Sequence, residues 1–141
     1  LSLVFCFISF TIMAVEPIST AIFSTSAVSG YDSVAYHTDQ KPTKGKSTIK
    51  YQWEGANWYF KSIKNRDLFI KNPGKYAPQY GGYCSWAISQ GYTASSDPEV
   101  WGIVDGKLYL NYSPEVQKKW KVKKKENIKN ANFNWPKIVG K

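Results

Sequence analysis

A single cysteine, Cys84, lies outside the apolar first fifteen residues, and this fact constrains the fold more than any other feature of the 141-residue chain. Because one thiol cannot close an internal disulfide, a packed core has to stabilise the protein. Aromatic residues make up 16% of the chain, and such side chains bury large areas on folding. The sequence therefore predicts one globular domain held together by its core.

Cys84 belongs to a segment, residues 81–94, whose glycines flank a short helix. Gly91 is a natural residue to follow the helix, because glycine readily adopts the left-handed conformation. Cys84 would lie in the first turn, where free amides and the helix dipole favour the thiolate. A small buried hydrophobe, which free cysteine often is, remains the alternative interpretation.

The N-terminus carries no charge before Glu16. Residues 1–15 are too short for a comfortable membrane span, and they are typical of the apolar part of a signal peptide. We expect the true start to precede Leu1, cleavage near Ala14 or near Ala27, and a periplasmic or secreted protein. An uncleaved anchor is the alternative. Residues 16–29, rich in Ser, Thr and Ala, predict an extended lead-in.

Two β-hairpins follow from alternation and turn residues. Apolar and polar side chains alternate from Ile49 to Trp53, and Glu54-Gly55 forms the turn to a second strand at 56–61. Asp-Gly at 105–106 is the strongest turn signal in the chain and joins strands at 100–104 and 107–112. These features predict an α+β fold class: a small antiparallel sheet of two β-hairpins with about three short helices.

Serines mark the starts of two further helices. Ser62 predicts a helix to about Lys71, and Ser113 before Pro114 predicts another, because Ser is favoured at the N-cap and Pro at the first helical position. The tail at 126–141 is expected to be a turn of helix and then a coil, anchored by Phe133 and Trp135.

Three ordered stretches, at 30–36, 58–84 and 106–112, resemble the exported YHS-domain proteins of bacteria. The resemblance covers about residues 22–136. It implies a YHS-like domain at 30–136, followed by a tail at 137–141.

The resemblance also implies a function. YHS domains are small binding modules that are described as binders of heavy metals, including modules fused to copper-transporting ATPases. The metal-binding relatives carry cysteines at positions that correspond to the region 30–32, to Lys61 and to Asn65. None of these is cysteine here, so a four-thiolate zinc site of that kind is absent.

Other residues could bind a metal. His37 is the only histidine, and Asp32 precedes it by five residues. A thiolate with an imidazole suits copper or zinc. We therefore expect an exported, non-catalytic YHS-type module that binds a soft transition metal through Cys84 with His37 and Asp32.

Two alternatives stay open at Cys84. A Cys–His pair could act as a nucleophile or a redox thiol, although no nucleophile elbow, phosphate loop or carboxylate pair accompanies it, and catalysis is not expected. A metal-free protein with an aromatic pocket for a small ligand is the other. The aromatic residues near Cys84 are Tyr76, Tyr80, Tyr83, Trp86 and Tyr92.

Net charge is +9, and lysines crowd the region 118–125. The region contains no arginine and no interleaved aromatic stacking pattern, so nucleic acid is not expected as a partner. A solvated helix face is the simplest interpretation. The alternative is a structural interaction module whose basic C-terminal helix makes a weak contact with an anionic surface or an acidic partner protein.

Overall fold

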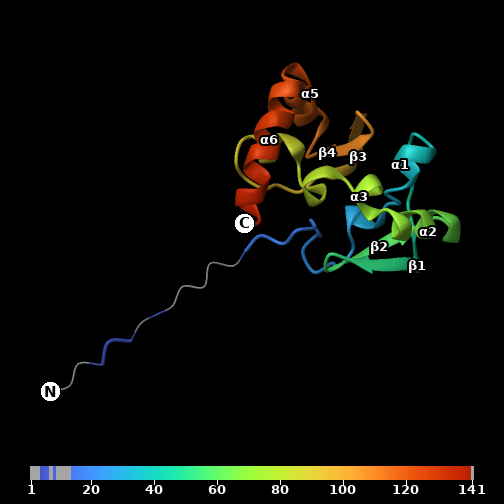
Figure 1. Cartoon of the computed structure of the whole chain (residues 1–141), viewed down its shortest axis with the longest axis horizontal. Helices are drawn as coiled ribbons and strands as arrows, with labels where there is room; N and C mark the ends of the chain where they lie inside the picture. Colours follow the sequence, from blue (N-terminus) through green and yellow to red (C-terminus); the bar gives the residue numbers. More distant parts are fainter. Residues whose placement is uncertain (1–3, 7, 9–13, 141) are drawn as a thin grey trace.

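The computed structural model describes residues 4–6, 8 and 14–140 (Figure 1). They form an α+β fold with two antiparallel hairpins and several short helices, which confirms the predicted class. In chain order the elements are η1 (Val28–Gly30), α1 (Ala35–Thr38), β1 (Lys46–Trp53), β2 (Ala56–Phe60), α2 (Ile63–Lys71), α3 (Pro73–Tyr76), η2 (Gln79–Gly82), α4 (Ser85–Ser89), β3 (Asp97–Val104), β4 (Lys107–Asn111), α5 (Pro114–Val122) and α6 (Lys124–Ile138), where η denotes a 3-10 helix.

The hairpins have the predicted turns. Glu54-Gly55 and Asp105-Gly106 all have positive φ, between 51° and 76°, which is the requirement of the tight hairpin turn whose twist matches the strands. Among the described residues β1 pairs only with β2, and β3 pairs only with β4. The two hairpins thus form two separate two-stranded sheets, and the single sheet that we expected does not form.

The predicted N-caps are also present. The Ser62 hydroxyl accepts a hydrogen bond from the backbone of Asn65, and the Ser113 hydroxyl accepts one from Val116. In α4 the N-cap is Cys84 itself, one position before the first turn, and Gly91 follows the helix with φ of 94°.

The prediction of a mostly coiled tail is wrong. The fifteen-residue α6 runs from Lys124 to Ile138, with Pro136 in its last turn. Ile128, Ala131 and Trp135 form a helical stripe that packs into the core, and this packing stabilises a helix of modest intrinsic propensity. Phe133 is not an anchor, because its side chain is 66% exposed, with the Lys137 ammonium 3.7 Å from its ring.

Strand β4 divides the core into two clusters because its side chains alternate between opposite faces. Leu108 and Leu110 pack in the first cluster, whereas Tyr109 packs in the second. The first cluster also contains Ile18, Ala27, Val28, Val34, Tyr36, Ala56, Trp58, Phe60, Phe69, Tyr76 and Ala77. The second also contains Tyr80, Ile88, Trp120 and Ala131.

The predicted lead-in at 16–29 contributes to the first cluster through Ile18, Ala27 and Val28. It folds back on itself through a bridge between Thr20 and Ala27, and it reaches the first hairpin through a bridge between Ser26 and Asn57. The signal-peptide prediction for 1–15 lies largely outside the described residues, and the domain boundaries stay predictions. In the part of the chain that the structure describes, no helix combines the length and apolar character needed to cross a bilayer.

Candidate functional site: a groove between the two clusters and a thiol cavity

Asp32 is fully buried and uses both carboxylate oxygens on protein donors. Oδ1 accepts hydrogen bonds from the backbones of Val34 (2.9 Å) and Ala35 (3.2 Å). Oδ2 accepts them from the backbone of Lys61 (2.9 Å) and from the side-chain amide of Asn65 (2.8 Å). With four donors on two oxygens, this carboxylate is a structural junction and is poorly suited to bind a metal ion.

The same junction involves two of the positions where cysteine is absent, Lys61 through its backbone amide and Asn65 through its side chain. Lys61 and Asn65 are the positions where the resemblance implies cysteines in metal-binding relatives, and both donate to Asp32. A hydrogen-bonded carboxylate therefore links these segments here. A thiolate site does not fit this arrangement, because the donors point at an anion that is already present.

His37 lies in α1, with its ring edge against the face of Tyr76 at 5.5 Å between centroids. Burial lowers the pKa of the imidazole; a hydrogen bond with the Tyr76 backbone opposes this shift, and the charge of Lys75 adds to it. Nε2 is buried and has no hydrogen-bond partner among the described residues. His37 therefore favours the neutral form and has one nitrogen free to accept a proton or a ligand.

Cys84 is 1% exposed, yet its sulfur has polar neighbours. The backbone amide of Tyr112 donates to Sγ at 3.3 Å, and the thiol donates to Asn111 Oδ1 at 3.6 Å. The opposite end of the Asn111 amide, Nδ2, is buried and has no partner in the described structure.

Cys84 also contributes to the wall of a cavity of about 160 Å³. Tyr92 and Tyr112, which line the same cavity, are 49% and 57% exposed, so the cavity reaches the surface. The sulfur lies in the wall of this open cavity, although its residue is almost inaccessible to water. The other lining residues are Trp86, Ala87, Ala94 and Val116.

The three predicted metal ligands are not brought together. Among residues 4–6, 8 and 14–140, no three His, Cys, Asp or Glu side chains lie where they could hold one ion. Asp32 binds its own segment, His37 packs on Tyr76, and Cys84 contacts Asn111 and Tyr112. Metal binding by Cys84 with His37 stays a prediction.

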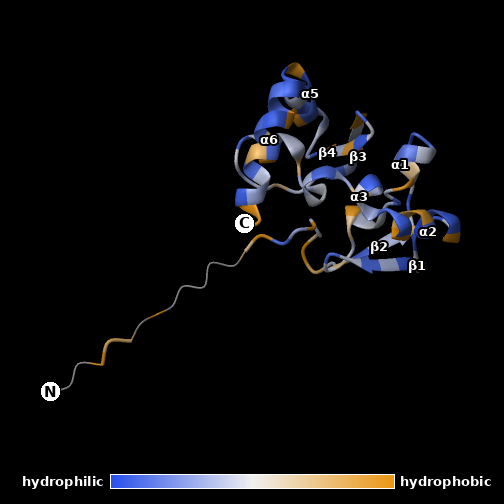
Figure 2. Ribbon diagram, viewed as in Figure 1, coloured by the Kyte–Doolittle hydropathy of each residue, from blue (hydrophilic) through white to orange (hydrophobic). Residues whose placement is uncertain are grey.

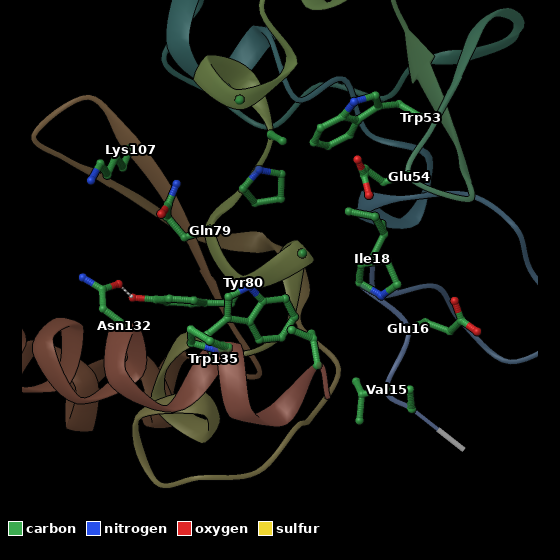
Figure 3. Close-up of a pocket in the computed structure, with 18 residues that line it drawn as sticks. Val15, Glu16, Ile18, Trp53, Glu54, Gln79, Tyr80, Lys107, Asn132 and Trp135 are labelled. Atoms are coloured by element: carbon green, nitrogen blue, oxygen red, sulfur yellow. Dashed lines mark hydrogen bonds between the residues drawn. The ribbon is translucent and has the colours of Figure 1, made fainter. Parts of the chain in front are cut away.

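A larger groove, of about 820 Å³, lies between the two clusters. Figure 3 shows Trp53 and Glu54 from the first hairpin on one side of it, and Trp135 and Tyr80 on the other. The lead-in forms a further wall through Val15, Glu16 and Ile18, among others. The remaining lining residues are Ala14, Pro17, Gly74, Ala77, Pro78, Gln79, Gly81, Lys107, Asn132, Pro136 and Val139.

The second side of the groove is fixed by a part-buried hydrogen bond and by ring packing. The Tyr80 hydroxyl donates to Asn132 Oδ1 at 2.8 Å (Figure 3). Burial raises the pKa of Tyr80 far above its usual value, and the neighbouring Tyr109 raises it further, so the phenol stays protonated and remains a donor. The ring of Trp135 lies against Tyr80 and Tyr83, at 6.2 and 5.8 Å between centroids.

The lead-in docks on η2 only because position 81 is glycine. A Cβ atom on Gly81 would lie 1.8 Å from the carbonyl oxygen of Pro17, and the residue has φ of 62°. The backbone of Ser19 donates to Gly81 O at 2.8 Å, and the Tyr83 hydroxyl donates to Glu16 O at 2.9 Å. The lead-in wall is therefore held by backbone contacts that a side chain at position 81 would prevent.

The sequence did not indicate this groove. Of the aromatic residues predicted near Cys84, Trp86 and Tyr92 line the thiol cavity and Tyr80 lines the groove, whereas Tyr76 and Tyr83 line neither. The sequence pattern places Trp53 in a strand and Trp135 in the C-terminal tail. They are 82 residues apart in sequence, and no local pattern signals that they line one groove.

Comparison with known proteins identifies the first half of the domain. Residues 34–80 match the model of the YHS domain. Residues 34–80 of this chain form a YHS domain. The matched segment contributes His37, Trp53 and Tyr80, whereas Asp32, Cys84 and all of α6 lie outside it. The groove therefore lies between the YHS segment, the lead-in and the C-terminal helix. No curated protein and no solved structure matches the chain.

Proposed function

We propose that this protein is a non-catalytic YHS-type binding module that takes a small organic molecule with a flat apolar body into the groove. The observation that carries the proposal is the pair of tryptophans, Trp53 and Trp135, which line the groove from separate segments of the fold. The volume, about 820 Å³, lies within the range of small-molecule sites.

Each tryptophan is supported from behind. Trp53 packs on Trp58 and Phe69, with ring centroids at 5.6 and 5.7 Å, and Trp135 packs on Tyr80 and Tyr83. Rings held by their neighbours lose little conformational entropy when a ligand binds, and this favours stacking on a flat molecule.

The charges around the groove favour a neutral or cationic ligand. Glu16 and Glu54 line it together with one lysine, Lys107, in a protein whose net charge is +9. A cation close to indole faces and carboxylates is attracted by both. Among the charged residues that line the groove, only Lys107 would attract an anionic ligand.

Three probes with the same naphthalene ring separate the contribution of ring stacking to affinity from the contribution of charge. They are naphthylmethylammonium (cationic), naphthylmethanol (neutral) and naphthoate (anionic), and each is titrated by ligand-observed NMR. We expect the ammonium to bind most tightly and the carboxylate least. Trp135→Ala should weaken all three by about tenfold, because the stacking surface is lost. The matched control is Trp101→Ala, since Trp101 packs on Tyr36 and does not line the groove.

The charge preference has its own variant. Glu54→Gln should reduce the advantage of the ammonium over the alcohol by up to about fivefold, while the alcohol itself binds as before. Equal loss of binding in Trp101→Ala and Trp135→Ala, or no binding of any probe, would contradict the proposal.

A second candidate function is binding of a soft metal ion, copper or zinc, at Cys84. The observation that favours it is a nearly buried sulfur that accepts an amide hydrogen bond and lies on a cavity reaching the surface. Cys84 is the one soft donor among the residues that line this cavity, so a partner, a free thiol or His37 would have to complete the coordination. This suits a transfer site more than a permanent one.

Anaerobic Cu(I) competition titration tests this candidate in a Cys6→Ser background, because Cys6 is exposed and would bind copper by itself. Cys84→Ser in that background should abolish one equivalent of binding. His37→Gln should weaken it if the imidazole shares the ion, and should leave it unchanged if Cys84 acts alone. Unchanged stoichiometry in Cys84→Ser would exclude the site.

We further propose that the protein acts outside the cytoplasm. The apolar character of residues 1–15 supports this. Fractionation of cells that express the full chain tests it: the protein should be recovered from the periplasm or the medium, and a charged substitution such as Val4→Lys should retain it in the cytoplasm.

A further inference from the structure

The corner between α5 and α6 combines a dense positive charge with an exposed apolar side chain. Residues 114–140 contain eight of the nineteen basic residues but two of the ten acidic ones. Val122, at the end of α5, is 80% exposed in the middle of the lysine run. We refer to residues 118–125 as the basic corner. Its six lysines are Lys118, Lys119, Lys121, Lys123, Lys124 and Lys125, and all are exposed.

Helix stability explains only part of these charges, since Lys119 and Lys121 lie in the last turn of α5, where cations are favourable, but the next three lysines are at the wrong end of a helix. Lys123 is the N-cap of α6, and Lys124 and Lys125 are its first residues. The N-terminus of a helix carries a partial positive charge, so cations there are unfavourable. The one acidic residue of that turn, Glu126, makes only a long ion pair with Lys123, at 3.9 Å. The lysines at the start of α6 therefore reduce the stability of the helix that carries them.

The corner is held in place on the core. Trp120 is 1% exposed, and Asn127 is 7% exposed. The Asn127 amide donates to the carbonyl of Trp120 at 2.9 Å and accepts from the Ser89 hydroxyl at 3.4 Å. These contacts satisfy the end of α5 and fix the angle at which α6 leaves. The corner lies at the far end of the molecule from β1 and β2 (Figure 1), and Figure 2 shows hydrophilic residues dominating α5 and the start of α6.

We propose that the basic corner docks on an anionic lipid bilayer, with Val122 entering the interface and the surrounding lysines contacting lipid headgroups. Charge complementarity supports a negative partner. The exposed valine within the cationic patch favours a bilayer over a nucleic acid, because Val122 cannot stack on bases and the corner has no arginine.

Co-sedimentation of the full chain with vesicles tests the proposal. Vesicles of phosphatidylcholine alone are compared with vesicles containing phosphatidylglycerol, and the readout is the ratio of the two partition coefficients. Any contribution of the apolar N-terminus is common to all variants, so it cancels between them. Binding should favour the anionic vesicles and should fall as salt rises.

Two matched variants locate the effect. Lys121→Gln/Lys124→Gln/Lys125→Gln should reduce the preference for anionic vesicles at least tenfold, since each lysine near the surface contributes about 1 kcal/mol. Lys41→Gln/Lys44→Gln/Lys50→Gln removes the same net charge from exposed positions elsewhere and should reduce it much less. Equal reductions in both variants would overturn the proposal, because the effect would then come from net charge alone.

Val122→Asn distinguishes a bilayer from an acidic macromolecule. It should weaken binding to anionic vesicles severalfold and leave binding to polyglutamate unchanged. If the protein bound polyglutamate but not vesicles, the partner of the basic corner would be an acidic macromolecule, and the proposal of bilayer docking would be overturned. An unchanged vesicle affinity in Val122→Asn would overturn insertion of the apolar side chain.

Discussion

Two buried polar junctions join distant segments of this protein, and they are built differently. At Asp32, in the first half, two oxygens accept four hydrogen bonds from separate donors. At Asn111, in the second half, Oδ1 accepts from the Trp86 backbone at 3.0 Å and from the Cys84 thiol, while Nδ2 has no partner among the described residues. The first junction is complete, whereas in the second the Asn111 amide nitrogen has no partner among the described residues.

The difference separates a structural role from a chemical one. A complete junction fixes the geometry and leaves no atom to bind a ligand. An incomplete junction costs stability, and here it leaves the Asn111 amide nitrogen next to Cys84 without a protein partner among the described residues. The Cys84 cavity therefore remains a candidate for chemistry, although it lies outside the segment that matches the YHS domain.

We expect the largest effect on stability when the first junction is broken. Asp32→Ala leaves four donors without their acceptor inside the protein, so it should lower the free energy of unfolding by at least about 3 kcal/mol, measured by urea denaturation. Asp67→Ala is the control, because the Asp67 side chain is 57% exposed and should matter by less than about 0.5 kcal/mol. Similar stability of Asp32→Ala and wild type would refute the structural role of Asp32.

The next effect concerns the lead-in, which closes the groove between the two halves. Gly81→Ala should lower the free energy of unfolding by about 2 kcal/mol or more. The added methyl group collides with the carbonyl of Pro17, and the backbone conformation at this position is also strained for alanine. The substitution should also increase the rate of amide hydrogen exchange at residues 16–19. Gly91 also has a positive φ but has open space around it, so Gly91→Ala is the control. It should lower the free energy of unfolding by about 1 kcal/mol and leave the amides of the lead-in protected from exchange. Equal effects at both glycines would show that the Pro17 contact is unimportant.

Breaking the second junction should have a smaller effect. Asn111→Ala removes the acceptor of the Trp86 amide at the start of α4, and we expect a loss of about 1 to 2 kcal/mol in denaturant unfolding. Asn130→Ala, an exposed position on α6, is the control and should lose no stability. If Asn111→Ala destabilises as strongly as Asp32→Ala, the contrast between the two junctions fails.

The smallest effect is a pH dependence at His37. Its folded-state pKa is lowered chiefly by burial, so the unfolded chain binds the proton more readily and stability falls as the pH drops below about 6.5. His37→Gln should remove this part of the decline between neutral pH and pH 5. Unfolding free energies measured across that range should therefore fall less steeply in the variant. Parallel curves would mean that His37 titrates as it does in the unfolded chain.

Several local features could be predicted from the sequence because they depend on neighbouring residues. The hairpin turns at Glu54-Gly55 and Asp105-Gly106 need positive φ, which glycine supplies. The N-caps at Ser62 and Ser113 form within three residues along the chain. The bonds from Asp32 to Lys61 and Asn65, in contrast, cross about thirty residues and leave no local signal.

The sequence by itself determined the α+β class, the two hairpins and the cap positions, since hydrogen bonding and backbone conformation act there over a few residues. Only the tertiary structure decided that the hairpins remain separate sheets, that 124–138 is a helix and that Trp53 and Trp135 line one groove. Side-chain packing between distant segments makes those choices, because the burial of a stripe or a ring depends on which surface it meets.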